Sequence, residues 1–109
     1  MECPSINNLK LDTYGQRAMQ EIADKRELGQ MLNPVLVGGT FMSIFLGSNT
    51  WQSAFSVAST DWSVLANAIQ KTGSITRKQI ELIAGMAALE SSGHDQKMFF
   101  RAIESGCKL

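Results

Sequence analysis

The side chains with the types needed for nucleophile and base chemistry are two cysteines, Cys3 and Cys107, and one histidine, His94. A thiol becomes a useful nucleophile when an imidazole is held within hydrogen-bond reach of it. Each cysteine lies close to an end of the chain, where such a geometry is hard to maintain. His94 stands beside Asp95 at the start of an expected helix, where capping is its simplest role. We therefore expect two unreactive thiols and no catalytic residue.

The residue patterns of other common sites are missing from the sequence. One histidine and two distant cysteines do not have the spacing of a metal site. The acidic residues are spread singly, each near a basic residue, rather than in pairs suited to hydrolysis. Gly38-Gly39 lacks the further glycine, lysine and hydroxyl of a phosphate-binding loop. The sequence thus predicts a protein that is not an enzyme and has no metal site and no cofactor.

The two cysteines also bear on the compartment of the protein. A Cys3–Cys107 disulfide would close nearly the whole chain into one loop and would contribute on the order of 4–5 kcal/mol. The opening residues 1–8, MECPSINN, have neither the basic nor the apolar region of a signal peptide. This favours a reducing cytoplasm and two reduced thiols, whereas a mature secreted chain would favour the bridge.

Length and composition indicate a single globular domain over residues 1–109. The hydrophobic fraction is 44% and the charged fraction is 18%, so disorder is not expected. Ten basic residues balance ten acidic residues. The charge balance therefore gives no electrostatic reason to expect binding to nucleic acid or to an anionic membrane.

One helix, over Ser74–Leu89, is expected to organise the fold, with Thr76 as its N-cap and Gln79 closing a capping box. One apolar stripe at helical spacing comprises Ile80, Ile83, Ala84 and Ala87. A second apolar group on the neighbouring side comprises Leu82, Met86 and Leu89. Because this apolar arc is wider than a surface helix needs, we expect a central helix at about 76–90 with other helices packed on two sides.

The N-terminal part of the chain is expected to start loosely and then to form a long helix. Residues 1–8 contain proline and asparagine, which are poor helix formers, and are predicted to be loosely ordered. A helical pattern follows from about Lys10 to Leu32. Gly29 weakens it and Asn33-Pro34 ends it.

Two amphipathic helices are expected to flank the central one. The first spans Trp62–Lys71, with Thr60 or Asp61 as its cap and Gly73 after its end. The second starts at Asp95. Its inward residues are expected to be Met98, Phe99, Ala102 and Ile103, and its outward residues Lys97, Arg101 and Glu104. Sustained alternation with a period of two residues is missing, so the sequence predicts an all-α fold, a compact single-domain bundle of five or six helices.

The segment Leu28–Thr60 contains no charged residue and no histidine. A buried helical hairpin at the domain centre is the favoured interpretation, although Pro34–Val37 also suits a strand. A membrane element is a second interpretation, but the apolar run Met31–Leu46 is interrupted and shorter than the ~20 residues of a spanning helix. The third is an exposed patch that binds a protein partner or a second copy. Its expected contact residues are Phe41, Phe45, Trp51 and Phe55.

The stretch Leu65–Met86, LANAIQKTGSITRKQIELIAGM, reads as a helix, a glycine-containing turn and a Thr-capped helix. It resembles the opening of winged-helix and helix-turn-helix repressors, in which a similar phrase starts the second helix. The resemblance implies a DNA-binding regulator that uses Arg77, Lys78, Lys97 and Arg101. From Asp61 to Leu109 the sequence holds six basic and five acidic residues, whereas a DNA reader usually shows a basic face.

The function that the sequence favours is protein interaction. We expect a small helical module, such as an immunity or antitoxin-type inhibitor or a secretion chaperone, that acts in the cytoplasm by binding another protein or a second copy. The alternative is the helix-turn-helix regulator that uses residues 65–86. An enzyme or small-molecule carrier with a pocket of Met and Phe ranks last, because no residue set specifies a reaction.

Overall fold

The computed structural model describes residues 3–4, 6, 9–28 and 59–108. These residues form four helices: α1 (Thr13–Ala23), α4 (Ser59–Lys71), α5 (Ser74–Glu90) and α6 (His94–Cys107). The Cα radius of gyration of 12.3 Å is that of a compact chain of this length. The all-α, compact architecture predicted from the helical periodicity is confirmed.

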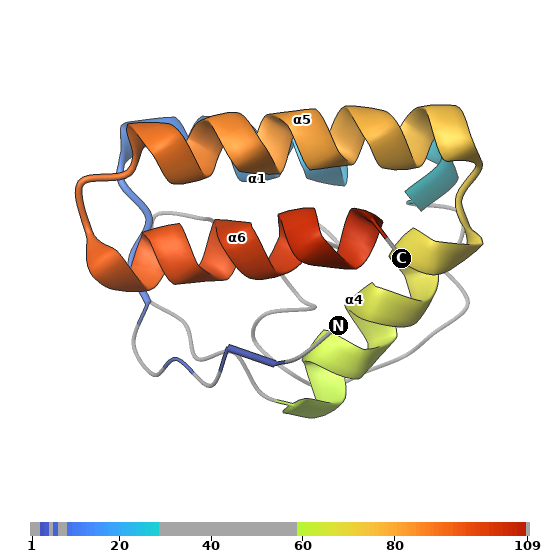
Figure 1. The fold of residues 1–109 in the computed structure, drawn as a ribbon, viewed down its shortest axis with the longest axis horizontal. Helices are drawn as coiled ribbons and strands as arrows, with labels where there is room; N and C mark the ends of the chain where they lie inside the picture. Colours follow the sequence, from blue (N-terminus) through green and yellow to red (C-terminus); the bar gives the residue numbers. More distant parts are fainter. Residues whose placement is uncertain (1–2, 5, 7–8, 29–58, 109) are drawn as a thin grey trace.

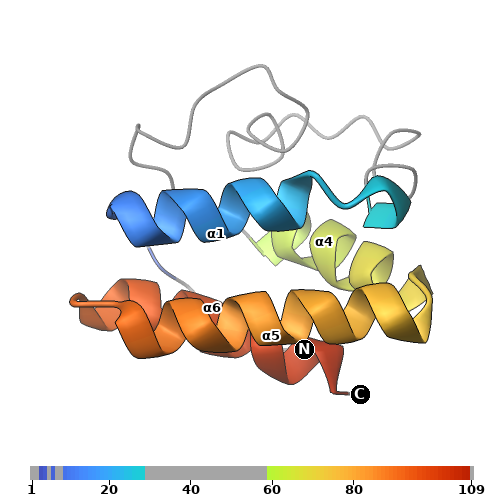
Figure 2. The same cartoon turned by 90° about the horizontal axis from the view of Figure 1, so that it is seen from above.

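Three of the helices lie side by side with alternating direction. α1 and α6 both run opposite to α5, and α5 packs against both of them (Figures 1 and 2). α4 descends away from α5 at a steep angle and packs against α6. The expectation that the helix at about 76–90 has neighbours on two sides is therefore confirmed, by α1 and α6.

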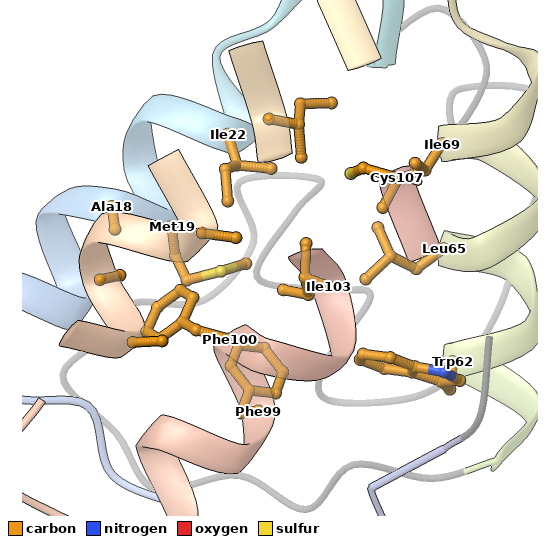
Figure 3. Close-up of a cluster of buried hydrophobic side chains, with 14 of the residues drawn as sticks. Ala18, Met19, Ile22, Trp62, Leu65, Ile69, Phe99, Phe100, Ile103 and Cys107 are labelled. Atoms are coloured by element: carbon orange, nitrogen blue, oxygen red, sulfur yellow. The ribbon is translucent and has the colours of Figure 1, made fainter. Parts of the chain in front are cut away.

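Aromatic side chains of α4 and α6 form the centre of the core (Figure 3). Trp62 meets Phe99 edge-on at 6.0 Å between ring centroids, and Phe99 meets Phe100 in the same way at 5.2 Å. Further buried residues from α1, α4 and α6 surround the rings: Met19, Ile22, Leu65, Ile69 and Ile103. Burial of each such side chain contributes about 1.5–3 kcal/mol, so this cluster holds the three helices together.

The inner side of α5 is built mainly from small residues. The predicted stripe is confirmed: Ile80, Ala84 and Ala87 are buried, and Ile83 packs partly buried against the core. Alanine side chains allow α5 to approach its neighbours closely. At Gly85 the approach is closer still, because a Cβ there would lie 2.6 Å from Glu104 Oε2 of α6.

The first helix is shorter than the predicted span Lys10–Leu32. Asp12 caps α1 by accepting a hydrogen bond from the Gly15 N–H at 2.8 Å, so the helix starts at Thr13. It ends at Ala23, where the Asp24 and Lys25 N–H groups bond back to carbonyls of the last turn. Before the helix, Ile6 is buried in the core; most of residues 1–8 lie outside the described residues, so their predicted loose order stays a prediction.

The predicted caps of the two middle helices are wrong. α4 already starts at Ser59, so Thr60 and Asp61 lie inside it. α5 starts directly after Gly73, which places Thr76 in its first turn rather than at its cap. The Thr76 hydroxyl donates its hydrogen bond to Glu27, a residue distant in sequence, in place of the predicted capping box with Gln79.

The core-facing side of α6 is rotated relative to the prediction. The helix begins at His94, and its buried residues are Gln96, Phe99, Phe100, Ile103, Gly106 and Cys107. Phe99 and Ile103 were predicted inward and are confirmed. Met98 is 39% exposed, and Phe100 takes the inward place instead. Residues 91–93 join α5 to α6.

Candidate protein-interaction surface

The outward side of α5 carries large apolar side chains that remain in water. Leu82, Met86 and Leu89 are 58%, 59% and 74% exposed, and Ile75 in the first turn is 76% exposed. α5 forms the upper edge of the molecule in Figure 1. The helix is thus apolar on two sides, and among the residues that the structure describes only its inner side packs against other helices.

The exposed residues of α5 follow a regular spacing. Ile75, Gln79, Leu82, Met86 and Leu89 are separated by alternating steps of four and three residues. Alternating steps of this kind place side chains along one line of a helix, as in the contact line of a coiled coil. We call these five residues the α5 seam. Gln79 is its polar member and is exposed like the others.

Two shallow grooves flank the seam. The first lies between α1 and α5 and is lined by Tyr14, Arg17, Ala18, Glu21, Leu82, Ile83, Met86, Ala87 and Glu90. The second lies between α5 and α6 and is lined by Glu81, Leu82, Gly85, Met86, Ala88, Leu89, Arg101 and Glu104. Leu82 and Met86 belong to both grooves, so they form a ridge between them. The outer wall of each groove carries one arginine and at least one carboxylate.

The N-terminal end of α5 is held by a carboxylate from outside the helix. Glu27 Oε1 accepts a hydrogen bond from the Gly73 N–H at 2.6 Å, and Glu27 Oε2 accepts one from the Thr76 hydroxyl. These donors, the hydroxyl first, hold the pKa of Glu27 below its ordinary value. A negative charge at this position also suits the positive end of the helix dipole.

The C-terminal end of α5 is held by a series of hydrogen bonds between buried polar groups. The Ser91 hydroxyl donates to the Ala87 carbonyl at 2.6 Å and accepts from Gln96 Nε2 at 2.8 Å. Gln96 Oε1 in turn accepts from the Asp12 N–H at 2.8 Å. These hydrogen bonds connect the end of α5 with the starts of α6 and α1. Since both ends of α5 are fixed in this way, the seam is presented on a supported helix.

The structure places the predicted contact residues and the seam in different parts of the chain. Phe41, Phe45, Trp51 and Phe55 lie outside the described residues, so their predicted role stays a prediction. Three of the seam residues, Leu82, Met86 and Leu89, belong to the wide apolar arc that the sequence predicts to be buried, whereas they are exposed. The signal that distinguishes the two sides is residue size: alanines occupy much of the inner side, and Leu and Met occupy the outer side.

The four basic residues of the DNA-binding alternative lie on two helices. Arg77 donates to the Gln70 carbonyl at the end of α4, and Lys78 pairs with Glu81 at 3.3 Å. Lys97 and Arg101 lie on α6, and Arg101 shares a groove with Glu104. DNA binding by these four residues stays a prediction.

The residues considered for chemistry are placed apart from the seam. Cys3 and Cys107 are not joined by a disulfide. Burial, with the nearby carboxylates of Glu81 and Glu104 adding to it, raises the pKa of Cys107 to about 11, against a smaller opposite effect of Arg77. Cys107 therefore stays protonated at neutral pH. His94 lies exposed in the first turn of α6.

Within residues 3–4, 6, 9–28 and 59–108, no three His, Cys, Asp or Glu side chains are grouped so that they could hold a metal ion. None of the helices in these ranges combines the length and hydrophobicity needed to cross a bilayer.

The seam is the most distinctive surface feature of the described chain. Comparison of the sequence with family models and with curated proteins, and of the fold with solved structures, finds no match. The function is therefore inferred from the chain's own surface.

Proposed function

We propose that the protein is a non-enzymatic protein-interaction module that binds a helix of its partner along the α5 seam. The observation that carries this proposal is the exposure of Leu82, Met86 and Leu89, each by more than half, on one line of one helix. Single exposed apolar residues are common on protein surfaces, but an aligned group of them is typical of a contact site.

The energetics favour coverage of the seam. Removing apolar surface from water stabilises a complex by roughly 25 cal/mol per Å². Much of this gain is usually lost in ordering the contacting groups. Here α5 is already fixed by Glu27 at one end and by Ser91 at the other, so little ordering of its backbone remains to be done.

The shape of the surface suits a helical partner. Side chains at alternating steps of four and three residues pack between those of a second helix. The grooves on either side of the Leu82–Met86 ridge give the flanking side chains of that helix a place to lie. Small inhibitors of the immunity or antitoxin type and secretion chaperones belong to this functional class, and we keep them as the favoured examples.

We also place the protein in the cytoplasm. Fractionation of host cells that express a tagged chain tests this placement, and recovery of the tag outside the cytoplasm would contradict it.

Site-specific photo-cross-linking in the native host tests the proposed function. A photoreactive amino acid replaces Met86 in the seam, and in a matched variant it replaces Asn67, which is exposed on α4. We expect discrete protein adducts from position 86 that are missing from position 67. Equal adduct patterns from the two positions, or none from position 86, would overturn the proposal.

A further inference from the structure

We draw no further inference here: the strongest candidate, the pocket between the start of α5 and the end of α6 that Arg77, Lys78 and Lys108 line, rests on a helix N-terminus and surface basic side chains, and no second observation in the described part of the chain points to a ligand there.

Discussion

Gly15 of α1 lies directly against the side-chain amide of Gln96 of α6: a Cβ on Gly15 would lie 2.6 Å from Gln96 Oε1. The amide cannot move away easily, because it is buried and bonded to both the Asp12 N–H and the Ser91 hydroxyl. Because residue 15 has no side chain, Gln96 has room to form the hydrogen bonds that join α1, α5 and α6.

Gly15→Ala should destabilise the protein by about 1–3 kcal/mol, because the new methyl group overlaps a fixed side chain. In a Gln96→Ala background the overlap is gone, and the better helix propensity of alanine should make the same change stabilising by about 0.5–1 kcal/mol. Urea unfolding of the wild type, the two single variants and the double variant measures both effects. A Gly15→Ala effect of the same sign in both backgrounds would contradict the described contact.

Gly85→Ala should behave differently, although the Cβ distance there is also 2.6 Å. The contacting atom is the end of the Glu104 side chain, which has freedom to rotate away. The gain in helix propensity should then dominate, so that the variant is between neutral and about 1 kcal/mol more stable. Urea unfolding beside Gly15→Ala provides the comparison, and a loss above about 1 kcal/mol would show that Glu104 is held in place.

Glu27→Gln should destabilise the protein at neutral pH and have little effect in acid. The folded chain lowers the pKa of Glu27 below 4.5, so the carboxylate stabilises the fold above that pH. This contribution is lost as the pH falls through the lowered value. The difference in unfolding free energy between wild type and variant should therefore shrink below pH 4.5. Glu21→Gln, on the exposed side of α1, makes the same change in net charge and is the matched control.

Cys107 should make the fold sensitive to alkali. Its pKa rises from 9.0 to about 11 on folding, so the thiol ionises first in the unfolded chain. The protonated thiol makes its full contribution to the free energy of unfolding below pH 9.0. This contribution is lost as the pH rises toward about 11, which lowers the free energy of unfolding by up to about 2 kcal/mol. Unfolding curves of wild type and Cys107→Ala across this range isolate the effect from that of other groups. Parallel pH profiles for the two chains would contradict the raised pKa.

Local sequence rules predicted the elements whose causes are local. The Ile80–Ala84–Ala87 stripe follows from helical spacing and is confirmed. The Thr76 cap was wrong because the competing partner, Glu27, is brought there by the tertiary fold. Burial of Gln96 could not be foreseen, because a polar residue on a helix is buried only when distant partners satisfy its amide.

The candidate surface was harder to predict than the fold. Leu82, Met86 and Leu89 have the residue types of a core, and periodicity alone does not say whether the same chain or another covers them. Met98 and Phe100 illustrate the same limit, since both are apolar and only packing in the core, where Phe100 meets Phe99, selects the inward one. The exposed fraction of each side chain in the folded structure shows which apolar residues the described chain leaves uncovered.

Cysteine labelling tests the central claim, that the α5 seam is covered in the cell, most directly. The measured quantity is the maleimide labelling rate of Leu89→Cys in intact host cells relative to that of the dilute purified protein, with Asn67→Cys as the reference. We predict that position 89 is protected several-fold in cells and that position 67 is not. Equal relative labelling at the two positions would contradict the claim.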